Sequence, residues 1–171
     1  MFLEKYFLNT SIFFKVGVKS GNGVIRLTVI TGCVIQDNNR ILMVQEGQGV
    51  EKELWNFPSG RLENKEKILN AAIREVEEET GYKISISGLL GVYNFISINN
   101  DQVIMFCYIG EVVGGSLRYD NNEIINVKWL SFGEIAELSD NKLRTHTLIR
   151  KIISDLKNKS TLPLDIVNDM I

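Results

Sequence analysis

A helix that begins at Asn64 or Lys65 and ends near Thr80 restricts the fold more than any other feature of this sequence. Apolar residues recur there at helical spacing, and Gly81 follows them as glycine follows many helices in a left-handed conformation. Strand-like runs precede and follow this helix, and further helical spacing appears only near the end of the chain. This order of elements predicts an α+β fold, with a mixed sheet and helices against its faces.

Five apolar, largely β-branched runs supply the expected strands, and Asn-, Asp- or Gly-rich turns separate most of them. They are Ile25–Gln36, Arg40–Gln45, Ile84–Ile96, Gln102–Val113 and Ile124–Leu130. Pro58 favours a short extended segment over Trp55–Leu62. Ser131 and Glu134 match a capping box for a short helix through Leu138, and helical spacing returns over Leu143–Leu156.

The chain of 171 residues is long enough for one domain with a substantial core. No repeat or linker divides it, and we expect the domain to occupy residues 25–157. Residues 1–24 are expected to form an extra strand, or an arm that pairs with a partner subunit. Residues 158–171 are polar and are expected to form a loosely packed tail.

Composition excludes some classes of partner. The formal net charge of −2 argues against a broad basic surface for nucleic acid. No apolar run approaches the ~18 residues that span a membrane, and the N-terminus lacks a signal-peptide core. Cys33 and Cys107 lie in apolar runs, which favours buried reduced thiols over a disulfide or a metal pair. We expect a cytoplasmic monomer or homodimer without a stable nucleic acid partner or a membrane.

The expected helix has an acidic face. A helix turns about 100° per residue, so Glu75, Glu78 and Glu79 share an arc of about 100° while Glu77 points elsewhere. Ile68 and Ala71 fall toward this acidic side. The apolar face lies opposite and comprises Leu69, Ala72, Ile73, Val76 and Thr80.

Carboxylates this close repel one another, and the negative end of the helix dipole adds to the repulsion. A cation would compensate for it, and oxygen ligands of this kind suit Mg²⁺ or Mn²⁺ together with water and substrate phosphate. Such an ion can polarise a phosphoryl oxygen and produce a hydroxide nucleophile. Arg74 adds a fixed cation that can hold a neighbouring carboxylate. The alternative for the acidic run alone is a solvated helix face.

The spacing around this run favours the metal site. The segment Gly60–Tyr82 resembles the signature of the Nudix hydrolases: Gly, five residues, Glu, seven residues, Arg-Glu, an aliphatic residue, any residue, Glu-Glu, any residue, Gly and an aliphatic residue. The matching positions are Gly60, Glu66, Arg74, Glu75, Val76, Glu78, Glu79, Gly81 and Tyr82. Only Tyr82 departs from the pattern, and its ring can still pack as an apolar body.

The resemblance covers most of residues 25–157 and implies the family's α/β/α sandwich, although Ser59 stands where many members have glycine. It implies that Glu75, Glu78 and Glu79 hold divalent metal ions, Mg²⁺ or Mn²⁺ as a substitute. The backbone carbonyl of Gly60 is expected to be a further ligand.

The resemblance also suggests catalytic roles around the metal ions. Arg74 is expected to orient Glu66 or Glu75, with Glu66 as a support or weak outer ligand. Members differ in their general base, which is either a signature Glu or a Glu in the loop before the last strand. That loop offers Asp120 and Glu123 here, and Glu123 resembles the outlying metal-binding Glu of MutT-type members. A solvated turn residue is the alternative for Glu123.

Several other side chains near the expected pocket are candidates for contact with substrate, although each also suits a surface or core position. Phosphate or base could be touched by Arg26, Gln45 and Arg61, and a base could stack on Phe57, Tyr93 or Phe95. His146 is the single histidine, and we expect it to pack or lie on the surface.

The signature leaves the substrate open. Some ADP-ribose-specific members have a proline downstream of it, which Ile96–Ile98 lacks, and dinucleoside polyphosphate hydrolases often have a Tyr where this chain has Asn99 and Asn100. The chain looks closest to small MutT-like members, which predicts a pyrophosphohydrolase of nucleoside tri- and diphosphates with a house-cleaning role. The alternatives are an ADP-ribose or nucleotide-sugar hydrolase and a non-catalytic nucleotide-sensing domain. The intact signature carboxylates disfavour the last.

Overall fold

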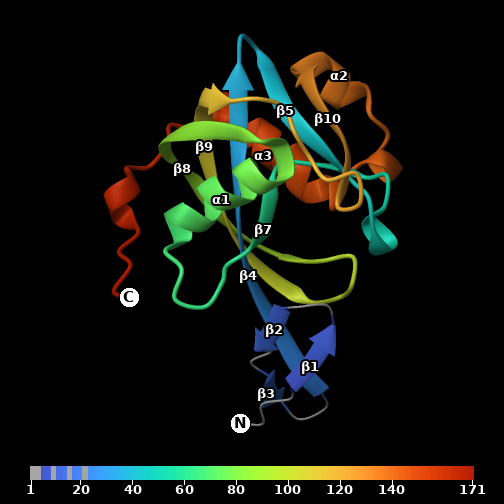
Figure 1. Cartoon of the computed structure of the whole chain (residues 1–171), viewed down its shortest axis with the longest axis vertical. Helices are drawn as coiled ribbons and strands as arrows, with labels where there is room; N and C mark the ends of the chain where they lie inside the picture. Colours follow the sequence, from blue (N-terminus) through green and yellow to red (C-terminus); the bar gives the residue numbers. More distant parts are fainter. Residues whose placement is uncertain (1–4, 9–10, 15–16, 21–22) are drawn as a thin grey trace.

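A mixed sheet of eight strands forms the centre of the protein (Figure 1). The computed structural model describes residues 5–8, 11–14, 17–20 and 23–171, and side chains from residue 27 onward. The main strand order is β10-β5-β4-β9-β8, in which β4 and β9 are parallel and the other neighbours antiparallel. These strands are β4 (Gly23–Asp37), β5 (Arg40–Glu46), β8 (Tyr82–Ile96), β9 (Gln102–Gly115) and β10 (Ile124–Ser131).

Shorter elements complete the architecture. The strands β6 (Trp55–Asn56) and β7 (Ser59–Arg61) pair with β5 and β4, and β3 (Gly17–Ser20) pairs with the first part of β4. A separate hairpin consists of β1 (Lys5–Leu8) and β2 (Ser11–Phe14). The α-helices are α1 (Ile68–Thr80), α2 (Phe132–Glu137) and α3 (His146–Asn158).

The sheet is covered on both faces, so the expected α/β/α sandwich is confirmed. Side chains alternate along a strand, and in β4 Cys33 therefore packs with Ala72 and Val76 of α1, whereas Val34 packs in the cluster that holds Ile149 of α3. Figure 1 shows α1 and α3 on opposite sides of the sheet. Cys33 and Cys107 are buried free thiols, as expected.

Two helix boundaries differ from the expected ones. The helix expected from Asn64 or Lys65 begins at Ile68, because Lys65 has φ 61° and Lys67 is extended. The helix expected from Leu143 begins at His146, because Leu143 forms a parallel bridge with Trp55. The capping box of Ser131 and Glu134 is confirmed at the start of α2. Ala71 is fully buried although the helical wheel placed it toward the acidic side, because the small side chain lets that part of α1 be covered.

The tail beyond α3 is better packed than expected. Leu162 pairs with Leu89 of β8, with N–H···O distances of 2.8 and 3.0 Å, and Leu164 and Val167 pack on the α1 side of the core. The Asp169 carboxylate accepts a hydrogen bond from the backbone N–H of Ile68, at 3.3 Å. The expectation of a loose tail is therefore wrong for these residues.

The N-terminal region is described only in part. Residues 1–4, 9–10, 15–16 and 21–22 lie outside the described residues, and so does the side chain of Arg26. An arm that pairs with a partner subunit therefore stays a prediction. Within the described part of the chain, no helix is long and apolar enough to cross a membrane.

Candidate active site

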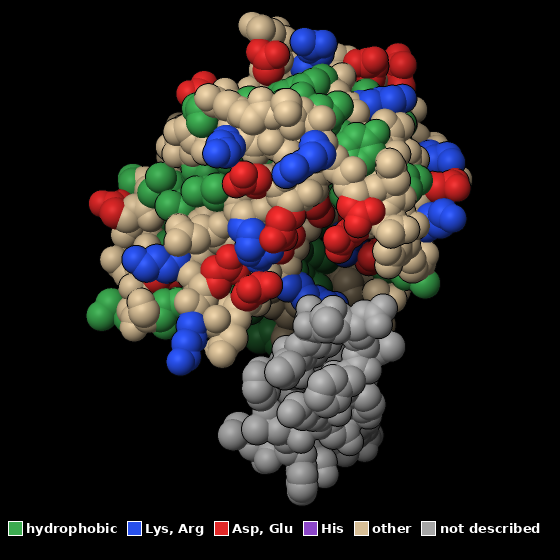
Figure 2. Space-filling model, in the orientation of Figure 1, with side chains coloured by type: hydrophobic (Ala, Val, Ile, Leu, Met, Phe, Trp, Pro, Cys, Tyr) green, Lys and Arg blue, Asp and Glu red, His purple; other side chains and the backbone are tan. Residues whose placement is uncertain are grey.

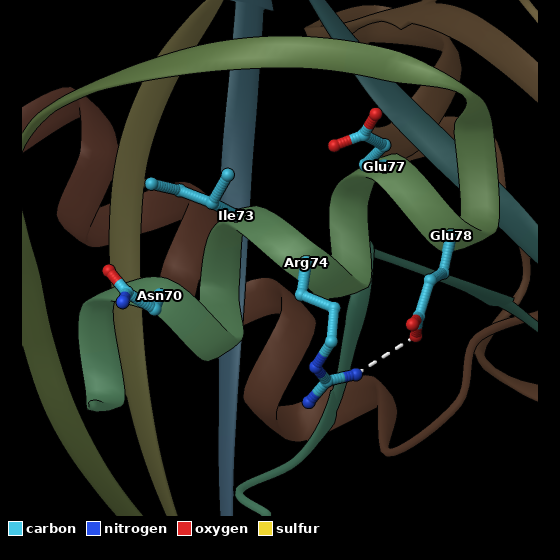
Figure 3. A pocket seen from close by; sticks show the side chains of 5 residues that line it. All are labelled: Asn70, Ile73, Arg74, Glu77 and Glu78. Carbon is cyan, nitrogen blue, oxygen red and sulfur yellow. Dashed lines mark hydrogen bonds and ion pairs between the residues drawn. The ribbon is translucent and has the colours of Figure 1, made fainter. Parts of the chain in front are cut away.

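An arginine on α1 holds the carboxylates of the acidic face together. The Arg74 Nε donates to Glu66 at 2.8 Å, and its Nη1 donates to Glu75 at 2.8 Å and to Glu78 at 2.9 Å. Its Nη2 donates to Glu66 and to the carbonyl of Arg61. In Figure 3, Arg74 reaches Glu78 along the helix while Glu77 points away from that pair. The predicted division of the acidic run is therefore confirmed for Glu77.

The strand β7 brings Gly60 against the first carboxylate. It pairs with β4, with Thr31 opposite Gly60, and this places the loop beside α1. A Cβ at Gly60 would lie 2.1 Å from the carboxyl carbon of Glu75, so any other residue there would displace this carboxylate. The signature glycine thus lets Glu75 keep its present position.

Glu79 is turned inward, unlike Glu78. Its carboxylate accepts a hydrogen bond from the backbone N–H of Ser59 at 3.0 Å. Burial, with smaller contributions from the charges of Glu46 and Glu75, raises the pKa of Glu79 well above its ordinary value. The wheel placed Glu75, Glu78 and Glu79 on one face, but only Glu78 is exposed, whereas Glu75 and Glu79 are partly buried.

The loop before β10 contributes a carboxylate to the same region. Glu123 is exposed, and its backbone carbonyl accepts from the N–H of Gly47 at 2.8 Å. Burial raises the pKa of Glu75, Arg74 opposes this rise, and the charges of Glu78 and Glu123 add to it. Glu123 is therefore near enough to interact with Glu75 electrostatically. Glu66 behaves oppositely, because the hydrogen bonds from Arg74 lower its pKa.

The donor atoms of this region suit a hard divalent cation. Among the described residues, no group of three or more His, Cys, Asp or Glu side chains already converges as a metal site, since Arg74 and Ser59 engage the carboxylates. Burial raises the pKa of both Glu75 and Glu79, and at Glu75 the hydrogen bond and charge of Arg74 oppose this rise. Carboxylates beside a backbone carbonyl are the oxygen donors that Mg²⁺ and Mn²⁺ prefer. The residues present therefore fit such an ion.

A polar cleft lies on the other side of Ser59. It is bordered by strand residues from β4, β7 and β9, by the loop after β8 and by the residues just before α3. Its walls include Thr28, Ile30, Glu51, Asn56, Ser59, Arg61, Phe95, Ser97, Asn99, Asp101, Val103, Arg144, Thr145 and Leu148. In the orientation of Figure 1, Figure 2 shows acidic and basic side chains intermixed over the middle of the visible face.

Comparison with known proteins assigns the fold and the signature to one family. The NUDIX domain profile matches residues 26–154, which is most of the chain. The chain belongs to the Nudix family of hydrolases. Its members act on phosphoanhydride bonds, and they generally use divalent metal ions.

The relatives of this Nudix hydrolase include proteins with different names. A putative 8-oxo-dGTP diphosphatase of Bacillus subtilis (strain 168) is 33% identical over 102 residues, which is 60% of this chain and 64% of that protein. The phosphatase NudJ of Escherichia coli (strain K12) is 28% identical over 143 residues, 82% of this chain and 90% of that protein. The match to the Bacillus protein thus spans less than two thirds of it.

Solved structures agree with this assignment. A NUDIX hydrolase from Nitrosomonas europaea superimposes with a TM-score of 0.76 and 30% identity, covering 83% of this chain and 96% of that one. A MutT NUDIX hydrolase from Burkholderia pseudomallei, at 23% identity and a TM-score of 0.66, covers 76% and 98% and shows the shared fold.

The remaining residues that were candidates for substrate contact lie in the cleft, in the core or on the surface. Arg61 and Phe95 line the cleft. Phe57 is buried in the core, Tyr93 donates to Asp155 of α3 at 3.1 Å, and the Gln45 amide donates to the carbonyl of Glu53. His146 is half exposed, 3.9 Å from Asp140, as expected. The predictions that Phe57, Tyr93 and Gln45 contact substrate receive no support from these contacts.

Sequence reasoning missed two residues of the Nudix site. Glu46 ends β5, and Arg144 stands just before α3, 98 positions away, yet the Arg144 Nη1 donates to Glu46 at 2.7 Å. Arg144 also contacts Glu51 at 3.1 Å. No local spacing joins these residues. The one signal was the position of Glu46 at the end of a predicted strand, where side chains often face a site.

Proposed function

We propose that the protein is a divalent-metal-dependent pyrophosphohydrolase of nucleoside diphosphate-X compounds, with nucleoside triphosphates as the foremost substrates and a house-cleaning role. The observation that carries this proposal is the close packing of Gly60 on Glu75, with Glu79 bonded to Ser59 next to a polar cleft that Ser59 also lines. Signature carboxylates lie at one end of the arrangement, and the cleft for the remainder of the substrate lies next to them.

We infer that Mg²⁺, with Mn²⁺ as a substitute, is held by Glu75, Glu78, Glu79, Glu123 and the carbonyl of Gly60. The ion would polarise a phosphoryl oxygen and lower the pKa of bound water. Glu75 and Glu78 would each offer the metal a carboxylate oxygen, with Arg74 beside them as the group that orients them.

The other side chains have supporting roles in this proposal. Arg74 orients Glu75, and Glu66 in turn holds Arg74 with two hydrogen bonds. Glu78 is the most exposed signature carboxylate that contacts Arg74, with 59% of its side chain accessible. Glu78 and Glu123 are therefore the two candidates for the base that accepts a proton from the attacking water, since both can reach solvent.

The cleft is suited to a nucleoside. It combines an aromatic ring at Phe95 with the cations of Arg61 and Arg144 and with acceptors such as Asp101. A base can stack on the ring while polar groups fix its orientation. The name of the Bacillus relative, a putative 8-oxo-dGTP diphosphatase, supports nucleoside triphosphates first. ADP-ribose or a nucleotide sugar is the alternative, and a non-catalytic nucleotide sensor is disfavoured by the complete set of carboxylates.

A substrate panel tests the proposal. Purified protein with Mg²⁺ at mildly alkaline pH should release pyrophosphate or phosphate from nucleoside triphosphates faster than from nucleotide sugars, ADP-ribose or dinucleoside polyphosphates. Glu78→Gln should lower kcat by about 10²-fold or more. Glu77→Gln, on the same helix but pointing away, is the matched control and should leave kcat unchanged. If the purified protein hydrolyses no compound in the panel, the proposed enzymatic activity is wrong.

A further inference from the structure

A continuous chain of hydrogen bonds joins the cleft to Glu79. The Arg144 Nη1 donates to Glu46 Oε1, and the Asn56 amide donates both to the same Glu46 oxygen at 3.4 Å and to Ser59 Oγ at 3.1 Å. The N–H of Ser59 then donates to Glu79 at 3.0 Å. Three residues, Glu46 of β5, Asn56 of β6 and Ser59 of β7, thus connect a cleft arginine to a signature carboxylate.

Arg144 is fixed from several directions. Its guanidinium lies between Glu46 and Glu51, whose side chains are 12% and 20% exposed, and its backbone N–H donates to the carbonyl of Trp55 at 2.9 Å. A planar guanidinium holds two carboxylates at once, which a lysine ammonium does not do with the same geometry. Arg144 thus joins the end of β5, the loop after it and the start of α3.

Glu46 makes this cation necessary. It is largely buried, and burial raises its pKa even though Arg144 opposes the rise. Its charge also acts on Glu79. A buried carboxylate that loses its cationic partner takes up a proton or moves toward water, because an unpaired buried charge is costly. Movement would remove the acceptor that holds Asn56, and protonation would weaken it, because a neutral carboxyl oxygen accepts less strongly than a carboxylate.

Ser59 is the last link, at a position where many family members have glycine. Its side chain fits because Gly32 lies opposite it on β4, where a Cβ would be 2.8 Å from the Ser59 Cβ. The Ser59 hydroxyl accepts a hydrogen bond from the Asn56 amide, which fixes the position of Ser59. The backbone N–H of Ser59 in turn donates to the Glu79 carboxylate.

We propose that Arg144 is a positioning residue of the active site, acting through Glu46, Asn56 and Ser59 to hold the Glu79 carboxylate for metal binding. The inference rests on the proposed function, because it takes Glu79 as a metal ligand. It assigns the link from cleft to metal site to residues outside the Gly60–Tyr82 signature.

The first test measures Mn²⁺ binding without substrate, by the electron paramagnetic resonance signal of free Mn²⁺. Arg144→Ala should weaken binding about 10- to 100-fold, the range found when partners of metal ligands are removed. Ser59→Ala, which removes only the hydroxyl, should also weaken Mn²⁺ binding. Arg150→Ala is the matched control. Arg150 lies on α3 and donates to the carbonyls of Ile135 and Leu138, outside the series of hydrogen bonds that links Arg144 to Glu79.

A double-mutant cycle separates positioning from direct substrate contact. If Arg144 acts through Glu46, adding Arg144→Ala to Glu46→Gln should weaken Mn²⁺ binding much less than Arg144→Ala does alone. If Arg144 only binds substrate, its replacement should raise KM and leave Mn²⁺ binding unchanged, which would overturn the inference. Arg144→Lys replaces the alanine variant if circular dichroism shows that the latter is unfolded.

The outcomes also separate this inference from the proposed function. A wild-type protein that neither binds Mn²⁺ nor hydrolyses any nucleotide would refute the proposed function. Suppose instead that the wild-type protein does both, and that Arg144→Ala and Ser59→Ala bind Mn²⁺ as tightly as Arg150→Ala does. The positioning role alone would then be refuted.

Discussion

Two arginines each hold a group of glutamates, on either side of the loop that contains Gly60. Arg74 bonds to Glu66, which precedes α1, and to Glu75 and Glu78 on α1 itself. Arg144 bonds to Glu46 and Glu51 beside the cleft. We call these the Arg74 cluster and the Arg144 cluster.

Each cluster holds one carboxylate that shows the contrast, Glu66 and Glu46, while burial also raises the pKa of Glu75 in the Arg74 cluster. In the Arg74 cluster, hydrogen bonds from Arg74 lower the pKa of Glu66. In the Arg144 cluster, burial raises the pKa of Glu46 in spite of Arg144. Pairing with an arginine therefore favours the ionised form of Glu66 but does not do so for Glu46. At Glu46 water is excluded, and the cost of desolvation outweighs the ion pair.

The largest effect is expected when the Arg74 cluster loses its cation. Arg74→Ala leaves Glu66, Glu75 and Glu78 without the group that orients them, and kcat/KM should fall about 10²-fold in steady-state assays with Mg²⁺. Arg74→Lys should recover only part of the loss, because lysine lacks the planar fork. Arg118→Ala, at an exposed arginine in the loop after β9 whose backbone N–H donates to Thr80 of α1, should retain normal kcat/KM. If Arg74→Ala keeps full activity, Arg74 does not orient the carboxylates of this cluster.

A smaller effect is expected where the tail supports α1, which carries the Arg74 cluster. No side chain of the preceding Lys67 caps α1, and Asp169 accepts from the N–H of Ile68 instead. Asp169→Ala should lower the free energy of unfolding by about 1 kcal/mol in urea denaturation, as the loss of a helix cap does. Asp169→Asn keeps an acceptor and should lose less. Equal losses in both variants would show that the contact contributes through charge and not as a cap.

The smallest effect is expected in the pH dependence of stability, because each carboxylate contributes a single titration. Glu66 has a lowered folded pKa, so its contribution is present above the ordinary value of 4.5 and is lost as the pH falls. Glu46 has a raised folded pKa, so its contribution is present below 4.5 and is lost as the pH rises. Glu66 and Glu46 should therefore respond to pH with opposite signs.

Urea denaturation of metal-free protein across acidic and neutral pH can measure this difference. Glu66→Gln should lose less stability than the wild type on acidification below about 4.5, and Glu46→Gln should lose less as the pH rises above that value. If both variants change the profile on the same side, the proposed contrast between the clusters is wrong.

The Arg74 cluster could be predicted because its members are neighbours in sequence. Helical geometry places Arg74, Glu75 and Glu78 from their spacing alone, and Glu66 follows from the signature. The strands and the capping box of α2 were predictable for the same reason, since alternation and capping depend on nearby residues.

The sequence by itself thus determined the family, the sandwich fold and the acidic face of α1, all of which depend on local spacing. Only the tertiary structure decided that Glu79 turns inward, that Arg144 meets Glu46, and that Asp169 reaches Ile68 across 101 positions. The physical reason is that burial and long-range pairing depend on which segments cover a side chain. A hydrogen bond between residues so far apart forms only after the sheet has brought their elements together.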